Sequence, residues 1–444
     1  MLHTSGDVPT RHVRMAAAPS TIPDPTRWSC AAALSLSFTL EDTVTSVAQR
    51  SPSGFFAQRV TNLAPSPTLA VSDKARQLKA QGIDVVDLGG GDPDFITPKH
   101  IRDAATASMN AGNTHYVASP GIPALRKAIA QKLQDDNQIE VDPMGGVVVT
   151  PGGKQSLFEA TLAFVEPGVD VLIPEPAWVS YAPMVELAGG RPIPVVLDPD
   201  DNWRITPEAL QAAVTPASRI LFLNSPSNPT GRVLDAAELQ AIADFANEHD
   251  LLIFSDEMYE KILYDGHTHT SIATLPGMAE RTLIFNGFSK AYAMTGWRLG
   301  YVAGPKPYIS QVEKVHSHSA TCATSFVQEA GVVALTGPQE FIGEMVEAWD
   351  RRRRAVASGL NNVKGVTCPL VEGAFYAFPD IRATGMSSSD AADLLLREAH
   401  VALTPGVAFG QAGEGHLRLS FATSDEELAK AVERITNVLG AKPS

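Results

Sequence analysis

Continuous apolar runs alternate with amphipathic segments through the middle of this chain. Strand-length runs that end in polar or turn-forming residues lie at 147–150, 169–175, 191–197, 219–225, 251–257 and 281–287. Strands that are apolar at consecutive positions are typical of sheets covered on both faces. Helical segments such as 236–250 lie between several of them, and this alternation is typical of parallel sheets built from βαβ units. The sequence therefore predicts an α/β fold, with a mostly parallel sheet flanked by helices.

The length of 444 residues suits more than one domain. Residues 99–335 hold the strand–helix alternation and are expected to form a large domain. Residues 336–444 begin with a long charged helix and continue with shorter strands and helices. We expect them to form a smaller α+β domain together with residues 55–98.

Residues 1–54 differ in composition from the rest of the chain. They are rich in Ser, Thr, Ala and Pro, and they contain Arg but no Lys. Such a segment has too little apolar periodicity to fold alone, so it is expected to be disordered or to act in targeting. An organellar transit peptide and a start codon placed too far upstream both remain open. The predicted location is the cytoplasm, with the plastid stroma as the alternative.

Charge and cysteine content exclude several classes of function. Acidic residues outnumber basic ones, 49 to 35, which gives a net charge of −14 and argues against a nucleic-acid or anionic-membrane partner. The hydrophobic fraction of 44% is typical of soluble globular proteins, and no apolar run has the length of a membrane span. Cys30, Cys322 and Cys368 are far apart without CxxC spacing, so neither a disulfide scaffold nor a zinc site is expected.

Side chains capable of chemistry follow four of the predicted strands. They are Asn228, Asp256, Tyr259, Ser289, Lys290 and the turn made by Gly152, Gly153 and Lys154. Taken singly, each has a structural explanation in turn chemistry or helix capping. Ligands of open α/β sheets bind beyond the carboxyl ends of the strands, where all of these residues are expected. Together they predict one pocket with an acid, a phosphate-binding turn and a nucleophilic amine.

The segment NGFSKAYAMTGWRLGY, 286–301, adds a second cation to this set. Lys290 follows a hydroxyl, Ser289, and Arg298 comes eight residues later in a run that is otherwise small and apolar. A surface turn with two solvated charges is the simpler interpretation. The alternative is a lysine that bonds to a cofactor and an arginine that binds the phosphate of that cofactor.

Longer motifs carry a family resemblance from about residue 55 to the C-terminus. They are GDPDF (91–95), YVASPG (116–121), GGKQ (152–155), PAWVSY (176–181), SPSNPTG (225–231), SDEMYE (255–260), SKAYAMTGWRLGY (289–301) and RLSFA (418–422). In order and spacing they resemble the class I, fold-type I aminotransferases that depend on pyridoxal 5′-phosphate. Within that family the chain is most similar to bacterial-type aspartate aminotransferases and to plant-type aspartate–prephenate aminotransferases. The resemblance implies a large cofactor-binding domain and a smaller α+β domain.

The resemblance also implies roles at the reacting end of the cofactor. Lys290 would bond to the cofactor aldehyde and later move a proton at the substrate Cα. Asp256 would hold the pyridine nitrogen protonated, so that the ring takes up electrons. Asn228 and Tyr259 would bind the phenolic oxygen, and Trp178 would stack on the ring.

The phosphate and the second subunit complete the implied cofactor site. Backbone N–H groups of the turn from Gly152 through Gly153 to Lys154, together with Ser289 and Arg298, would bind the phosphate. Tyr116 matches a tyrosine that reaches the phosphate of the neighbouring subunit. A homodimer is therefore expected.

Substrate recognition is implied at both ends of the pocket. Arg418 would bind the α-carboxylate as a bidentate fork, with the backbone at Gly91 and the side chains of Trp178 and Asn228 nearby. Lys154, beside Thr68, would meet the second carboxylate of aspartate or glutamate. The alternative is that Lys154 only caps the phosphate-binding turn.

These roles predict an aminotransferase that moves an amino group between L-aspartate or L-glutamate and a 2-oxo acid in a ping-pong cycle. Expected acceptors are oxaloacetate and 2-oxoglutarate, with prephenate left open. A C–S lyase on the same scaffold and an aminotransferase of aromatic or neutral amino acids are the alternatives.

No metal site is predicted. No third ligand accompanies the pair His316 and His318 or the lone His416, so all three histidines are expected at the surface or in polar packing. The run 351–354 (RRRR) is expected to be a solvated, ion-paired helix face.

Overall fold

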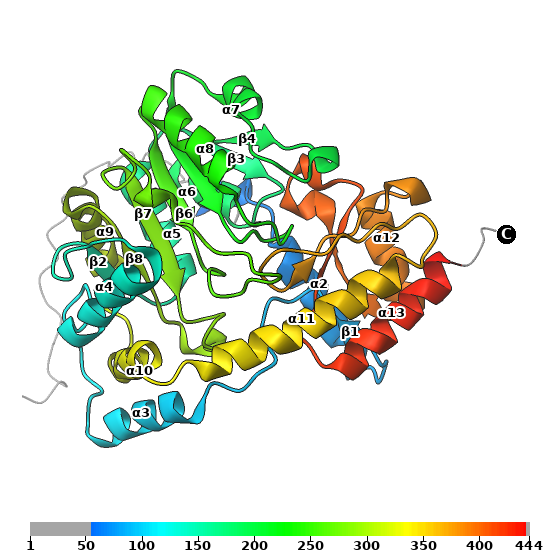
Figure 1. Ribbon diagram of the computed structural model, residues 1–444, viewed down its shortest axis with the longest axis horizontal. Helices are drawn as coiled ribbons and strands as arrows, with labels where there is room; N and C mark the ends of the chain where they lie inside the picture. The colour runs from blue at the N-terminus through cyan, green and yellow to red at the C-terminus, as the bar shows by residue number, and fades with distance from the viewer. Residues whose placement is uncertain (1–54, 441–444) are drawn as a thin grey trace, which may run out of the picture. The chain divides into compact units, whose positions relative to one another are not determined.

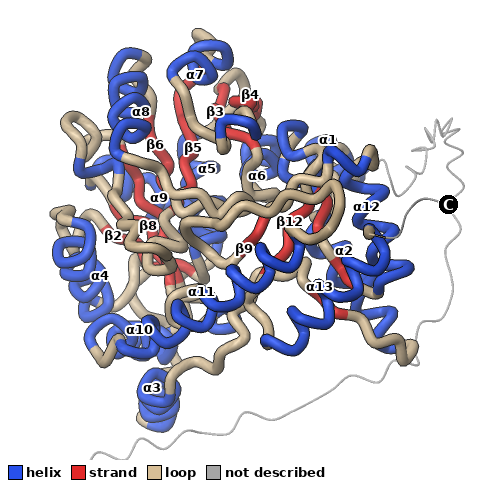
Figure 2. Tube along the Cα trace, turned by 45° about the vertical axis from the view of Figure 1, so that its right-hand side comes forward, coloured by secondary structure: helices blue, strands red, loops and turns tan. Residues whose placement is uncertain are grey.

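The computed structural model describes residues 55–440, so the predicted N-terminal extension and Cys30 lie outside the described residues. The largest sheet has seven strands in the order β2-β8-β7-β6-β5-β3-β4. Figures 1 and 2 show this sheet with helices around it. The strands are β2 (Val147–Thr150), β3 (Asp170–Glu175), β4 (Arg191–Val196), β5 (Ser218–Asn224), β6 (Leu252–Asp256), β7 (Thr282–Gly287) and β8 (Gly300–Ala303). Only β8 runs antiparallel to its neighbours in this sheet. The predicted mostly parallel sheet is confirmed.

Helices cover both faces of this sheet. Val147 and Val149 of β2 point into an apolar cluster with α4 (Pro123–Asn137) and α10 (Ser325–Thr336), whereas Val148 points into a cluster with α5 (Gly153–Phe164) and α9 (Lys306–Ser319). Side chains alternate between the faces of a strand, so the two clusters lie on opposite sides. The other helices beside the sheet are α6 (Tyr181–Ala188), α7 (Pro207–Ala213) and α8 (Ala236–Glu248), and α3 (Lys99–Asn110) packs against α10. Burial on both faces explains the continuous apolar runs.

Two strands differ from the sequence prediction. The run 191–197 was expected to be buried on both faces, but β4 is the edge strand, and Val196 is 62% exposed. Pro192 and Pro194 have no backbone N–H, so they cannot donate a hydrogen bond to a neighbouring strand. An interior strand needs such donors on both sides, whereas an edge strand needs them on one side only. Strand β8 was not predicted, because its four residues follow Arg298 in a segment that we interpreted by its side-chain chemistry.

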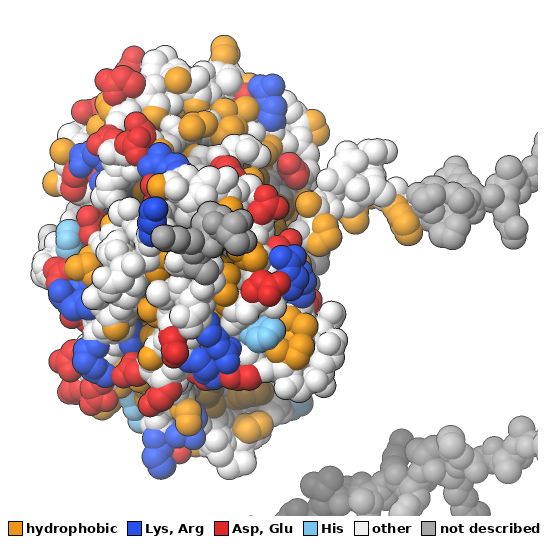
Figure 3. Space-filling view, turned by 90° about the vertical axis from the view of Figure 1, so that its right-hand side faces the viewer, with side chains coloured by type: hydrophobic (Ala, Val, Ile, Leu, Met, Phe, Trp, Pro, Cys, Tyr) orange, Lys and Arg blue, Asp and Glu red, His pale blue; other side chains and the backbone are white. Residues whose placement is uncertain are grey.

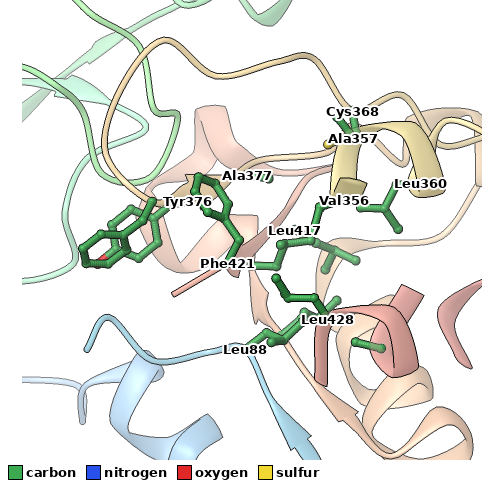
Figure 4. Close-up of a cluster of buried hydrophobic side chains, with 14 of the residues drawn as sticks. Leu88, Val356, Ala357, Leu360, Cys368, Tyr376, Ala377, Leu417, Phe421 and Leu428 are labelled. Atoms are coloured by element: carbon green, nitrogen blue, oxygen red, sulfur yellow. The ribbon is translucent and has the colours of Figure 1, made fainter. Parts of the chain in front are cut away.

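A second core joins the N-terminal and C-terminal parts of the described chain. Leu88, beside β1 (Val86–Asp87), packs with α11 (Glu340–Leu360), and Figure 4 shows Leu417, Phe421 and Leu428 converging on the same cluster. The remaining elements here are α2 (Pro67–Ala80), β9 (Tyr376–Ala377), α12 (Ser388–Leu394), β10 (Val401–Ala402), β11 (Thr404–Pro405), β12 (Leu417–Ser420) and α13 (Asp425–Leu439), whereas α1 (Gln58–Thr61) has no buried residue and lies beside α6. Strand β1 pairs with β10, and β11, β12 and β9 form a three-stranded antiparallel sheet. The predicted domain boundaries stay a prediction.

Short helical turns connect these elements. They are η2 (Pro199–Asp201), η3 (Ile272–Thr274), η4 (Thr295–Trp297), η5 (Arg382–Thr384), η6 (Leu395–Ala399, a π-helix), η7 (Gly406–Phe409) and η8 (Gln411–Gly413). Within residues 55–440 no helix is both long and apolar enough to cross a membrane. On the face drawn in Figure 3, basic and acidic side chains are interspersed.

The arginine run on α11 is only partly the solvated face that we expected. Arg353 is 2% exposed, and it binds Asp265 at 2.6 Å and the carbonyl oxygen of Val371 at 2.9 Å. Its position on the inner side of α11 takes it out of solvent, so this part of the prediction was wrong. His316 is fully buried, and its Nδ1 lies 3.0 Å from a carboxylate oxygen of Glu159. That is the polar packing expected for this histidine.

Candidate active site

A cavity of about 430 Å³ lies at the carboxyl ends of β5, β6 and β7, where the second core meets the sheet. It brings together segments that are far apart in the sequence. The predicted site residues that line it are Thr68, Gly91, Gly153, Lys154, Trp178, Asn228, Asp256, Tyr259, Ser289, Lys290, Arg298 and Arg418. Gly152 stands directly beside Arg298. Tyr116 does not line the cavity, and it is 86% exposed.

Lys290 lies three residues beyond the end of β7 and points into this cavity. Its ammonium nitrogen donates a hydrogen bond to the carbonyl oxygen of Gly91 and lies 5.7 Å from the ring centre of Phe375. Burial lowers the pKa of Lys290 to about 8, although the carboxylate of Asp92 acts in the opposite direction. An amine with this pKa is partly neutral near physiological pH. It is therefore suited to act as a nucleophile and as a proton carrier.

Asp256 ends β6, with 7% of its surface exposed. One carboxylate oxygen, Oδ1, accepts the backbone N–H of Met258 at 3.2 Å, and the other, Oδ2, accepts the hydroxyl of Tyr181 at 2.7 Å. Burial raises the pKa of Asp256 to about 6, while the hydrogen bond from Tyr181 acts against that rise. A carboxylate held this way is suited to bind a cationic N–H donor inside the cavity.

Arg418 on β12 is the buried cation of the site, at 3% exposure. Its guanidinium lies 4.6 Å from the ring centre of Tyr376 and 4.9 Å from that of Phe409. One terminal nitrogen donates to Asn228 Oδ1 at 3.0 Å, and the other donates to the carbonyl oxygen of Gly89. Its Nε has no hydrogen-bond partner among residues 55–440. A guanidinium placed in this way can bind a carboxylate as a fork.

Hydrogen bonds among Asn224 on β5, Tyr376 on β9 and the segment 256–259 at the end of β6 connect the floor of the cavity. The hydroxyls of Tyr259 and Tyr376 lie 2.9 Å apart. The Oδ1 of Asn224 accepts the backbone N–H of Asn228 at 2.8 Å, and its Nδ2 donates to the backbone oxygen of Asp256 at 3.0 Å. These bonds fix the ends of neighbouring strands relative to one another, so the cavity is preorganised.

The start of α5 forms an end of the cavity that is suited to an anion. Gly152 precedes the helix with φ 92° and ψ 156°, and a Cβ built on it would lie 2.7 Å from Arg298 Nη2. No side chain caps the helix, so its first N–H groups face outward. Ser289 and Lys154 stand beside them in the cavity lining. Free N–H groups, the helix dipole and two cations together favour a phosphate or carboxylate.

Lys154 also faces the aromatic wall of the cavity. Its Nζ lies 4.8 Å from the ring centre of Trp178. Burial of the amine, with the nearby charge of Arg298, lowers the pKa of Lys154. Although it stands in the cavity lining, it has no salt bridge within the described part of the chain. A cation that lines the cavity and has no carboxylate partner there can bind a ligand carboxylate.

Sequence reasoning missed three residues of the site. Tyr181, Asn224 and Tyr376 line the cavity, and each hydrogen-bonds a predicted residue or its backbone. Tyr181 lies within the PAWVSY motif and Asn224 at the end of a predicted strand, so position alone could have indicated both. Tyr376 comes from the aromatic run GAFYAF, which carries no signal that separates it from core residues.

The fold is that of a known class of enzymes. The family described as "Aminotransferase class I and II" matches residues 83–435, and the chain belongs to this family. It is an aminotransferase, and membership implies dependence on pyridoxal 5′-phosphate.

Individual relatives cover almost all of the described chain. An aromatic-amino-acid aminotransferase 2 of Thermococcus litoralis is 44% identical, covering 82% of this chain and 94% of the relative. An aspartate/prephenate aminotransferase of Cereibacter sphaeroides is also 44% identical, over 86% and 98% of the two chains. The solved structure of an aspartate aminotransferase from Thermus thermophilus with maleate is 42% identical, with a TM-score of 0.83, and covers 86% and 99%.

The residues in the cavity fit pyridoxal 5′-phosphate. The start of α5 offers N–H groups for a phosphate, and the space above Gly152 would be filled by any Cβ. Asp256 offers a buried carboxylate for the pyridine nitrogen, and Lys290 offers an amine of lowered pKa for the aldehyde. The donors and acceptors therefore match the charges of the cofactor at its phosphate, ring nitrogen and aldehyde.

Proposed function

We propose that this chain transfers the amino group of L-aspartate or L-glutamate to 2-oxo acids, including oxaloacetate and 2-oxoglutarate. One relative is named for aromatic amino acids and another for aspartate and prephenate, and both have the same sequence identity to this chain. Sequence identity therefore does not decide between these substrates. The observation that carries the proposal is the pair of cations in one cavity, Arg418 and Lys154. Arg418 would bind the α-carboxylate, and Lys154 would bind the distal one.

Two features support a distal carboxylate at Lys154. Its ammonium lies against the face of Trp178 without a salt bridge to residues 55–440, so it is available to a ligand. Thr68 lines the same cavity and can add a hydroxyl donor. The solved Thermus thermophilus relative was studied with maleate, which is a dicarboxylate.

When bound, pyridoxal 5′-phosphate supplies an aldehyde that carries the amino group and a ring that takes up electrons. The residues of this chain do the rest. Lys290 would hold the cofactor, and its amine would move a proton at the substrate Cα. Asp256 keeps the ring nitrogen protonated, since a buried carboxylate favours a cation beside it.

The other residues bind and orient. Asn228 and Tyr259 would bind the phenolic oxygen of the cofactor, and Trp178 would stack on its ring. The turn from Gly152 to Lys154 would bind the phosphate together with Ser289 and Arg298. Arg418, which lies against two aromatic rings, would orient the substrate through its α-carboxylate, with the backbone at Gly91 nearby.

A kinetic panel tests the substrate proposal. We expect Lys154→Ala to lower kcat/KM for aspartate about tenfold to a hundredfold while kcat/KM for alanine changes little, because one charge-assisted hydrogen bond contributes about 1.5–3 kcal/mol. Lys154→Arg keeps the charge and should retain part of the preference, and Lys127→Ala, at an exposed position on α4, serves as the surface control. An unchanged aspartate-to-alanine ratio in Lys154→Ala would remove the distal role. Prephenate belongs in the same panel as a further acceptor.

A second candidate reaction is β-elimination, a C–S lyase activity on the same scaffold. Incubation with L-aspartate and 2-oxoglutarate should yield oxaloacetate and glutamate. Incubation with L-cystathionine should yield no pyruvate or ammonia. The reverse pattern would favour the lyase.

A further inference from the structure

Tyr181 has a position that the proposed roles of the site do not use. It is the first residue of α6, and 3% of its surface is exposed. Its hydroxyl donates to Asp256 Oδ2 at 2.7 Å. Its ring meets the edge or face of Trp178 at 5.3 Å and of Phe222 at 5.1 Å between ring centres, nearly perpendicular in both cases. One side chain therefore contacts both the buried carboxylate and the indole proposed to stack on the cofactor.

We propose that Tyr181 is a positioning residue that holds the Asp256 carboxylate ionised and aimed into the cavity. The inference rests on the proposed role of Asp256 toward the ring nitrogen. With Oδ1 bound to the N–H of Met258 and Oδ2 bound to Tyr181, the carboxylate cannot rotate away without breaking a hydrogen bond. Each oxygen keeps a further lone pair for a ligand N–H.

The surroundings of Asp256 explain why such a donor is needed. Burial disfavours the charged form, and Glu257 adds a like charge, so both raise the pKa of Asp256. The positive charge of Lys290 opposes this rise from across the cavity, but its amine is also the group proposed to bond to the cofactor. The hydrogen bonds from Tyr181 and from the backbone of Met258 do not involve that amine. Of these two, Tyr181 is the contribution that a substitution can remove.

Tyr181 can serve as a donor over the whole working range of pH. Burial, together with the neighbouring Asp256, raises the pKa of the Tyr181 phenol well above its usual value. The hydroxyl therefore keeps its proton where Asp256 loses its own. A hydrogen bond to a charged group stabilises the charged form.

Binding of pyridoxal 5′-phosphate to the cofactor-free chain between pH 5 and pH 7 tests this role. Tyr181→Phe keeps the ring and its contacts with Trp178 and Phe222, and removes only the hydroxyl. We expect the pH at which cofactor affinity falls to move upward by about one unit, with affinity near pH 6 lowered about tenfold. Asp256 would then protonate at a higher pH and lose its attraction for the pyridinium.

Tyr264→Phe is the matched control. Tyr264 is also 3% exposed, and its hydroxyl donates to the carbonyl oxygen of Ala374 at 2.6 Å, outside the cavity lining. Its loss should lower the free energy of unfolding to a similar extent without moving the pH profile of cofactor affinity. A Tyr181→Phe profile that coincides with that of Tyr264→Phe would overturn the inference.

A double-mutant cycle separates this inference from the proposed site. In an Asp256→Asn chain, Tyr181→Phe should change cofactor affinity less than about twofold, since no carboxylate remains to be held. A full tenfold loss in that background would mean that Tyr181 acts by another route, and would overturn the inference alone. Wild-type affinity at every pH in Asp256→Asn itself would overturn the proposed role of Asp256, and with it the inference.

Discussion

Asp256 is a buried carboxylate, and its negative charge destabilises the folded chain when no cation is bound beside it. A carboxylate with 7% exposure stands in a cavity, and burial raises its pKa to about 6. The hydrogen bonds from Tyr181 and Met258 offset part of this cost. A bound cation would offset the remainder, and the proposed cation is the protonated ring nitrogen of the cofactor.

This cost predicts how the cofactor-free chain responds to Asp256→Asn. The native pKa lies above the unfolded value of 3.8, so the folded chain binds more protons between about pH 4 and pH 6, and stability falls as the pH rises through that window. Asparagine does not titrate. We expect the variant to be more stable than wild type by up to about 3 kcal/mol above pH 6, and by little at pH 4, in urea unfolding.

Asp84→Asn is the control of opposite sign. Asp84 is exposed, and hydrogen bonds from Lys430 and Arg434 lower its pKa. Stability that comes from such a group is present above the unfolded pKa and is lost as the pH falls, so this variant should be less stable near neutral pH. A gain for Asp256→Asn that is equal at pH 4 and pH 7 would contradict the electrostatic account.

At the scale of an element, the start of α5 also combines an unfavourable local feature with a proposed function. Gly152 combines φ 92° with ψ 156°, a conformation that is essentially restricted to glycine. The missing side chain also leaves room for Arg298 above the helix N-terminus. Turn, helix and arginine together form an end of the cavity that is suited to an anion.

Gly152→Ala should therefore lose both stability and cofactor affinity. We expect the free energy of unfolding to fall by about 1–3 kcal/mol and the affinity for pyridoxal 5′-phosphate to fall at least about tenfold. Gly112→Ala is the control, since Gly112 also has a positive φ, +85°, but nothing lies within 4 Å of its added Cβ. That variant should lose stability and keep its affinity. Equal affinity in the two variants would argue against the phosphate role of this turn.

The sequence predicted the strands and helices better than it predicted the side-chain contacts between them. The apolar runs and the polar residues at their ends predicted the sheet and the side from which Lys290 and Asp256 enter the cavity. Edge placement of β4 was missed, because its apolar residues match those of interior strands, although Pro192 and Pro194 favour an edge strand. The hydrogen bonds of Tyr181 and Tyr376 depend on which ring faces which carboxylate or hydroxyl, and tertiary packing decides that.

At the scale of the whole molecule, the role of Tyr116 decides whether the active site is built from one chain or shared between two subunits. It is 86% exposed and stands outside the cavity of its own chain. The predicted homodimer, in which this tyrosine reaches the partner's phosphate, stays a prediction.

The predicted location of the protein also stays a prediction, and a native N-terminus near Phe55 in mass spectrometry would indicate processing.

A hybrid dimer tests the shared site. One subunit carries Tyr116→Phe and the other carries Lys290→Ala. If Tyr116 acts across the interface, the hybrid has one site with an intact lysine and an intact tyrosine, and its activity per such site should match wild type. If Tyr116 acts within its own chain or not at all, the hybrid will gain nothing over the Tyr116→Phe homodimer. Light scattering that shows a fully active monomer would also contradict the dimer.

The central claim is that Lys290 forms the covalent bond to the cofactor. Borohydride treatment of the cofactor-loaded chain converts that bond into a stable secondary amine, and peptide mass spectrometry then locates it. We expect an absorbance band at the edge of the visible range to disappear, with the adduct on the peptide that contains Lys290, also in the Lys154→Ala variant. An adduct on another lysine, or full turnover by Lys290→Ala, would contradict the account.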